Sequence, residues 1–161
     1  MMPPSDLNQW SLYKTPETSP GYLLWRTSTT WRKLIELALK PTKLTHPQFV
    51  VLASIDWLSK GDQKASQADV GRHAGLDPNT ISQILGGLQT KNLVERIRSN
   101  NERSKFHRLT QEGRERLSQA IPLIEKTDQD FFAILAQDEE IFLKLLGKLP
   151  YNYGNSGNSV K

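Results

Sequence analysis

The fold is decided by residues 64–109, which read KASQADVGRHAGLDPNTISQILGGLQTKNLVERIRSNNERSKFHRL. A capping serine at Ser66 and a left-handed stop at Gly75 predict one short helix. Asp77 offers a capping carboxylate and Pro78 suits the first helical position, so a second helix begins there. The turn between them is about three residues long, as a helix-turn-helix requires.

The second helix has one apolar stripe and one uncharged polar side. Its apolar residues recur at i, i+3, i+4 and i+7 and are Ile81, Ile84, Leu85 and Leu88. Asn79 and Gln83 point directly away from this stripe, with Thr80 and Ser82 on its shoulders. Amide side chains pair with adenine, and hydroxyls bond to bases or touch a thymine methyl, so this side has base-reading chemistry. The alternative interpretation is an ordinary polar side that faces solvent.

A basic hairpin follows the helix pair. Residues 93–98 and 104–109 predict two short strands around a polar loop at 99–103. The basic residues of this hairpin are Arg96, Arg98, Arg103, Lys105 and Arg108. A helix-turn-helix followed by such a hairpin is typical of a winged helix.

The excess positive charge of the chain is concentrated in the same stretch. Residues 64–108 hold eight basic and four acidic residues, a surplus of four, and the whole chain has a net charge of +4. A randomly distributed set of charges would spread this surplus over the chain. Its concentration indicates a surface that neutralises nucleic-acid phosphates.

Composition excludes several other classes of protein. The chain has 161 residues, enough for one domain with a core, and 37% of them are hydrophobic. It contains no cysteine, which excludes disulfides and thiolate metal sites, and its three histidines lack metal-ligand spacing. We therefore expect no metal and no cofactor. No apolar run suits a membrane helix and the start does not resemble a signal peptide, so we expect a cytoplasmic protein without a membrane partner.

Long helices are predicted on both sides of the winged helix. Apolar residues in the first helix lie on more than one side, Trp25 and Leu39 among them, which indicates burial against a second subunit. The fold class is therefore mainly α with a small β-hairpin wing. We predict an extended N-terminal arm at 1–19, a helical dimerisation region at 20–41 and 110–149, a winged helix-turn-helix DNA-binding lobe at 42–109, and a disordered tail at 150–161.

Several linked motifs in this order resemble the MarR family of bacterial transcriptional regulators over roughly residues 20–149. The motifs are Leu44-Thr45-x-x-Gln48-Phe49-x-Val51-Leu52, Ala74-Gly75-Leu76-Asp77-Pro78-x-Thr80-Ile81-Ser82, Leu93-Val94-Glu95-Arg96, Glu102-Arg103 and Leu109-Thr110-x-Glu112-Gly113. The resemblance implies a homodimer in which the first and last helices intertwine and two winged helices bind a palindromic operator in double-stranded DNA. It also implies a small aromatic or phenolic effector, bound between the dimerisation helices and the DNA-binding lobe.

Site residues follow from the residues and from this resemblance. Asn79, Thr80, Ser82 and Gln83 match the base-contacting positions of the second helix, and Arg103 matches the arginine at the wing tip. The candidate contacts of the wing and the flanking phosphates are Ser66, Arg72, Lys91, Arg98, Arg103 and Lys105. The candidate lining of an effector pocket is Trp25, Trp31, His46, Phe49 and Trp57.

Some positions depart from the family pattern. Gln83 and Gly87 stand where basic residues are frequent, and Ser104 replaces a second wing arginine. Gly86-Gly87 lies inside the second helix, which indicates either a kinked or frayed helix or a close approach to a DNA backbone. His107 stands where the second wing strand faces inward, and we expect a hydrogen-bonded structural histidine.

The leading hypothesis is a homodimeric, sequence-specific DNA-binding transcriptional regulator, a repressor relieved by a small aromatic or phenolic effector. The alternative is a winged-helix module for protein interactions in which DNA binding is weak or lost, because the face of the second helix is neutral and contains a glycine pair. We do not expect an enzyme. The sequence contains no phosphate-binding loop, nucleophile elbow or paired-carboxylate motif.

Overall fold

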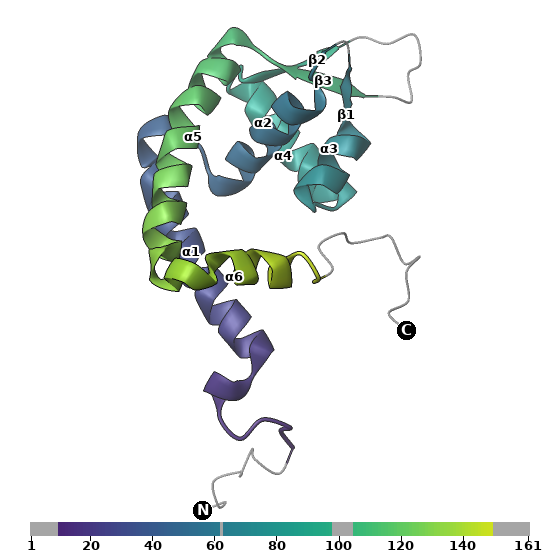
Figure 1. The fold of residues 1–161 in the computed structure, drawn as a ribbon. Coiled ribbons are helices and arrows are strands. Elements are labelled where there is room, and N and C mark those ends of the chain that lie inside the picture. The colour runs from purple at the N-terminus through teal and green to yellow at the C-terminus, as the bar shows by residue number, and fades with distance from the viewer. Residues whose placement is uncertain (1–9, 62, 98–104, 150–161) are drawn as a thin grey trace, which may run out of the picture.

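A computed structural model describes residues 10–61, 63–97 and 105–149 of the chain. Figure 1 shows a lobe of short helices and strands beside two long helices, α1 and α5, that run next to each other. In chain order the elements are η2 (Pro16–Thr18), α1 (Pro20–Leu39), η3 (Lys40–Thr42), α2 (His46–Leu58), β1 (Ala65–Ser66), α3 (Gln67–Ala74), α4 (Pro78–Thr90), β2 (Val94–Ile97), β3 (Phe106–Leu109), α5 (Gln111–Phe132), η4 (Ala133–Asp138) and α6 (Glu139–Leu146).

The helices begin at capping side chains, as the sequence predicts for Ser66 and Asp77. The Ser66 hydroxyl accepts a hydrogen bond from the Asp69 amide at 3.1 Å, and the Thr110 hydroxyl accepts one from the Gly113 amide at 2.9 Å. Thr45 and Gln48 form a reciprocal capping box at the start of α2. These bonds satisfy amide groups that have no partner within their own helices, so they fix where each helix begins.

The strands form a three-stranded antiparallel sheet in the order β1-β3-β2. The predicted hairpin is confirmed, since Val94 pairs with Leu109 and Ile97 with Phe106. The third strand was not predicted. It consists of Ala65 and Ser66 alone, which pair with β3 and join the start of α3 to the sheet.

The backbone requires glycine at positions 75 and 113. Gly75 ends α3 in the left-handed conformation, with φ of 67°, as predicted. Gly113, in the first turn of α5, lies so close to the segment between α4 and β2 that a Cβ there would be 1.9 Å from the Leu93 carbonyl oxygen. Only glycine fits at this position, which explains physically why the motif at 109–113 ends in one.

The core lies where the lobe meets the upper parts of α1 and α5 (Figure 1). Its fully buried side chains come from α1, α2, α3, α4 and the segment just before β2, and the largest are Ile35, Leu39, Leu52, Ile55, Ile81, Leu85, Leu88 and Leu93. Leu117, Ala120 and Ile124 add the buried face of α5. The predicted apolar stripe of α4 is thus confirmed as the side that holds this helix on the lobe.

The two ends of the chain differ from the core in burial. The arm was predicted as extended, but its described part, residues 10–19, contains the short 3-10 helix η2 because Thr15 caps a turn at Pro16. Residues 1–9 and the predicted tail at 150–161 lie outside the described residues. At the other end, α6 follows a sharp backbone change at Ala136, where φ is 45° and ψ is −118°. None of the residues of α6 is buried within one chain.

Candidate nucleic-acid interface

Asp77 fixes the start of α4. Its Oδ1 accepts hydrogen bonds from the amides of Asn79 and Thr80, both at 3.0 Å, and the Thr80 hydroxyl donates to its Oδ2 at 2.5 Å. The hydrogen bond from the Thr80 side chain is the main cause of a lowered Asp77 carboxyl pKa, followed by the bond from the Thr80 amide. The carboxylate therefore stays ionised at the positive end of the helix dipole.

This cap changes the role available to Thr80. Its hydroxyl hydrogen is occupied by Asp77 and the residue is partly buried, so its methyl group and the lone pairs of its oxygen remain for other contacts. Asn79, Ser82 and Gln83 are exposed, as the helical spacing predicts. The structure thus presents three of the four predicted side chains on the outside of α4.

No charged residue occurs between Pro78 and Thr90, the two ends of α4. The exposed side of this helix therefore offers amide and hydroxyl groups, together with the bare backbone at Gly86, but no net charge. Such a side gains little from phosphate attraction and can recognise a partner only through hydrogen bonds and close shape. We call the exposed residues Asn79, Ser82, Gln83 and Gly86 the outer face of α4.

The predicted phosphate contacts surround this helix, and several already have partners within the chain. Ser66 caps α3 and donates to Asp69, which also forms an ion pair with Arg72. Lys91 donates through Nζ to the Lys43 carbonyl at 3.0 Å and to Gln48 Oε1 at 2.9 Å, so it joins the end of α4 to α2.

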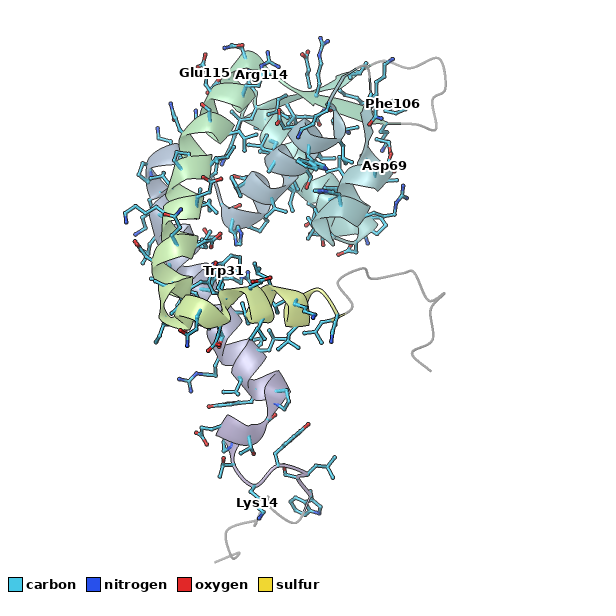
Figure 2. The ribbon with its side chains drawn as sticks, viewed as in Figure 1. Lys14, Trp31, Asp69, Phe106, Arg114 and Glu115 are labelled. Carbon is cyan, nitrogen blue, oxygen red and sulfur yellow. The ribbon has the colours of Figure 1, made fainter. Side chains whose placement is uncertain are left out.

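The remaining predicted contacts belong to the wing. Lys105 is exposed just before β3, while Arg98 and Arg103 lie outside the described residues. On the sheet itself Arg108 forms an ion pair with Glu95 at 2.7 Å between Nε and Oε1. Of the predicted wing contacts the structure therefore describes Lys105 alone, next in sequence to Phe106, which Figure 2 labels at the start of β3.

His107 differs from its prediction. The side chain faces inward from β3 and is only 3% exposed, but its Nδ1 has no hydrogen-bond partner among the described residues, so the prediction of a hydrogen-bonded histidine is wrong for that atom. Burial lowers the pKa of His107, and the nearby charges of Arg96 and Lys105 lower it further. Sequence alone could not show this, because the orphan atom depends on how β1 and β2 flank the ring.

Two of the predicted pocket residues meet between α1 and α2. The rings of Trp31 and His46 pack edge to face with centroids 5.1 Å apart. The Trp31 indole Nε1 donates to Asp128 Oδ1 at 2.7 Å, where α1 and α5 run side by side (Figure 2), and the His46 amide donates to Glu36 Oε1 at 3.0 Å. Asp128 was not among the predicted pocket residues, because the pairing joins positions 97 residues apart.

The charges around His46 act in opposite directions. Burial is the largest cause and lowers the pKa of His46; Glu36 and Asp128 raise it, and Arg32 lowers it. The net shift is downward, so the imidazole is neutral near pH 7. This corner thus combines an aromatic pair, a neutral imidazole and a carboxylate that bonds to an indole.

The other predicted pocket residues are not brought to this corner. Phe49 packs against the core, while Trp25 and Trp57 are exposed, and the Lys60 ammonium lies 3.6 Å from the centroid of the Trp57 ring. An open polar hollow lies elsewhere, between η3 and the start of α5, and is lined in part by Lys43, Glu112 and Arg116. None of the five predicted pocket residues lines it.

Within residues 10–61, 63–97 and 105–149, no three His, Asp or Glu side chains are grouped so as to hold a metal ion. No helix in these ranges is long and apolar enough to cross a membrane.

Comparison with known proteins places this geometry in a family. Residues 33–120 match the family model described as transcriptional regulator SarA/Rot. The HTH-type transcriptional regulator YdcH of Bacillus subtilis (strain 168) is 33% identical over 143 residues, which is 88% of this chain and 97% of that protein.

Solved structures agree with this assignment. The Mycobacterium tuberculosis MarR family protein Rv2887, solved with salicylic acid, is 32% identical over 83% of this chain and 97% of that one, with a TM-score of 0.64. Bordetella bronchiseptica BpsR, whose DNA binding is regulated by 6-hydroxynicotinic acid, is 25% identical over 80% of this chain and 96% of that one, with a TM-score of 0.73. The chain therefore belongs to the MarR-like family of winged-helix, DNA-binding transcriptional regulators.

Proposed function

We propose that this regulator binds a two-fold symmetric operator as a homodimer, with the outer face of α4 in the major groove of each half-site. The observation that supports this most strongly is the uncharged, exposed set of Asn79, Ser82 and Gln83 on a helix whose opposite side is buried. Asn and Gln amides can pair with adenine, and the Ser hydroxyl can donate or accept at most base edges. Two such helices would read half-sites about one DNA turn, roughly 34 Å, apart.

Affinity for the duplex would come from the residues around α4. We propose phosphate contacts from the wing and from the cationic and hydroxyl groups beside the helix, namely Ser66, Arg72, Lys91, Arg98, Arg103 and Lys105. The surplus of positive charge within residues 64–108 supports this assignment. The ion pair of Arg72 with Asp69 and the bonds of Lys91 leave protons of both cations free for a phosphate oxygen.

The second subunit would cover apolar side chains that one chain leaves exposed. We propose residues 20–41 and 110–149 as the dimerisation region and 42–109 as the DNA-binding lobe. In the dimerisation region many large apolar side chains are exposed, including Leu23, Leu24, Trp25, Leu37, Ile134, Ile141, Leu143 and Leu145. Exposed apolar side chains in such number support a protein interface in this region.

We propose further that the protein is a cytoplasmic repressor that a small aromatic acid or phenol releases from DNA, and that it acts without catalysis. Salicylic acid in Rv2887 and 6-hydroxynicotinic acid for BpsR support this ligand class. Trp31 and His46 lie between the lobe and α5, so a ring bound against them would alter how the lobe sits on α1 and α5. Phe49 packs against the core and Trp25 and Trp57 are exposed, so these three side chains would contribute only after rearrangement.

Selection of genomic fragments followed by footprinting tests the DNA-binding proposal. The expected result is protection of a sequence with two-fold symmetry, bound with a Kd of about 10⁻⁸ M or below at physiological salt. Micromolar binding that ignores sequence would contradict it and would favour a winged helix used for protein contacts. Titration of the complex with salicylate tests the effector; unchanged operator affinity at millimolar salicylate, phenol and 6-hydroxynicotinate would contradict that part alone.

A further inference from the structure

Gly86 and Gly87 occupy the middle of a helix that continues through both of them. α4 runs without a break from Pro78 to Thr90, so the glycine pair does not kink or end it. Each glycine makes a helix less stable than alanine would, because it loses more backbone entropy on folding and adds no side-chain contact. Helix stability therefore does not explain the two glycines.

The fold itself does not require glycine at position 86. Gly86 is exposed, and a Cβ built on it would meet no atom of the chain within 4 Å. The glycines with positive φ in the described residues are Gly61 and Gly75, so Gly86 has a backbone that any residue can adopt. By contrast, Gly113 is needed because its backbone touches Leu93. Neither a positive φ nor a close backbone contact requires glycine at position 86.

Gly86 lies on the same side of α4 as two of the predicted base-contacting residues. Gly86 lies three residues after Gln83 and seven after Asn79, so all three share one side of α4. One turn further on, the Thr90 hydroxyl folds back and donates to the Gly86 carbonyl at 3.0 Å. The outer face of α4 is therefore low at its C-terminal end, with amide side chains toward the start of the helix and backbone alone at Gly86.

We infer, building on the proposed DNA-binding function, that Gly86 is a specificity-determining residue at which the duplex touches the backbone of α4. The missing side chain lets the helix lie deeper in the major groove than an alanine would allow. The short amides of Asn79 and Gln83 then reach base edges although no cation on α4 pulls the helix toward the phosphates. Shape complementarity between Gly86 and the duplex would thus supply part of the affinity for which α4 has no charged side chains.

The test is Gly86→Ala in the full-length protein, measured by fluorescence anisotropy on the selected operator and on a random duplex of equal length. Alanine stabilises an exposed helix, so we expect Tm to rise by about 2–4 °C. We expect operator affinity to fall by about tenfold or more, the scale of one lost base contact, with affinity for random DNA changed by less than about twofold. A more stable protein that binds its operator less well cannot be explained by misfolding.

Gly87→Ala is the matched control. It makes the same change one residue along, where the chain is partly buried and the new Cβ would lie 3.8 Å from Gln48 Nε2 of α2, in ordinary contact. We expect this variant to gain stability and to keep operator affinity within about twofold of wild type. Loss of affinity in both variants would overturn the inference, because helix flexibility and not contact at Gly86 would then explain the glycines. Full affinity in Gly86→Ala would also overturn it, whereas failure of the wild type itself to discriminate operator from random DNA would overturn the proposed function instead.

Discussion

The lobe from α2 to β3 differs from the helices α1 and α6 in how many of its large apolar side chains are buried. The lobe buries Val51, Leu52, Ile55, Val70, Ile81, Leu85, Leu88, Leu93 and Val94 within one chain, and Trp57 is its only large apolar side chain among the exposed ones in the described residues. In α1 and α6 most of the large apolar side chains are exposed. The lobe thus buries its own apolar residues, whereas α1 and α6 need a second surface to cover theirs.

A single chain can present the outer face of α4, whereas two chains are needed to place two such faces on one operator. One lobe presents a complete outer face on α4 and exposed cations beside it. Placing two such faces at a fixed spacing depends on the helices that are incomplete alone. Damage to the helical region should therefore reduce operator binding without unfolding the lobe, whereas damage to the lobe core should lower the stability of the lobe itself.

The largest effect is expected for Leu145→Asp, which puts a charge into the exposed apolar side of α6. Leu145 is 54% exposed in one chain, so the substitution has little effect on the folded monomer but prevents its burial against a partner. We expect a monomer in light scattering and a loss of operator affinity of about 10²–10⁴-fold, the advantage of joining two binding sites. Lys144→Asp, a larger change of charge on the neighbouring residue, should remain dimeric; a dimeric Leu145→Asp would break the comparison.

The next effect concerns the lobe core. Leu88 is fully buried in α4, and Leu88→Ala removes its contacts and leaves a cavity, so the free energy of unfolding should fall by about 2–5 kcal/mol. Chemical denaturation measures this value. Leu12→Ala, at a side chain that is 97% exposed, should change stability by less than about 0.5 kcal/mol. Equal losses from the two substitutions would show that the lobe core is not where the stability lies.

A smaller effect is expected where α1 meets α5. Asp128→Ala would leave the Trp31 indole N–H without its acceptor, at a cost of about 1–3 kcal/mol. Asp128→Asn keeps an oxygen at this position and should lose less. Denaturation followed by tryptophan fluorescence compares the two variants. If asparagine cost as much as alanine, the hydrogen bond would not be the stabilising feature.

The smallest effect is a pH dependence from His107. Burial lowers its pKa in the folded protein, so the unfolded chain takes up the proton more readily. The neutral ring therefore supports full stability above the ordinary histidine pKa of about 6.5, and that stability is lost as the pH falls through the lowered folded value. We expect His107→Leu to show a shallower decline in Tm between about pH 7.5 and pH 5 than the wild type. His46, whose pKa is also lowered, would account for part of the remaining slope, and identical slopes would contradict the role of His107.

Local chemistry predicts much of this fold. Ser66, Gly75, Asp77 and Thr110 mark helix ends because caps and left-handed stops act within a few residues, and the structure places them at those ends. The apolar stripe of α4 could also be predicted, because its residues recur with the period of an α-helix. The outer face of α4 is the direct consequence of that stripe, so its exposed members could be named from sequence.

Features that depend on distant pairing could not be predicted in the same way. β1 has only two residues, too few for any alternation, and exists because β3 pairs with it. The bond from Trp31 to Asp128 joins two helices that are far apart in sequence, and the orphan Nδ1 of His107 depends on the strands on both sides of it. The need for glycine at Gly113 becomes visible only once Leu93 lies against it.

The most direct test of the central claim, that the outer face of α4 reads bases, is the ratio of affinities for operator and random DNA. For the wild type we expect a ratio of at least about 10³ at physiological salt. Gln83→Ala should lower the ratio by about 5- to 150-fold, the value of one base contact, while Gln89→Ala, the same change nearer the end of the helix, should leave it unchanged. A ratio that Gln83→Ala leaves at the wild-type value would contradict the claim.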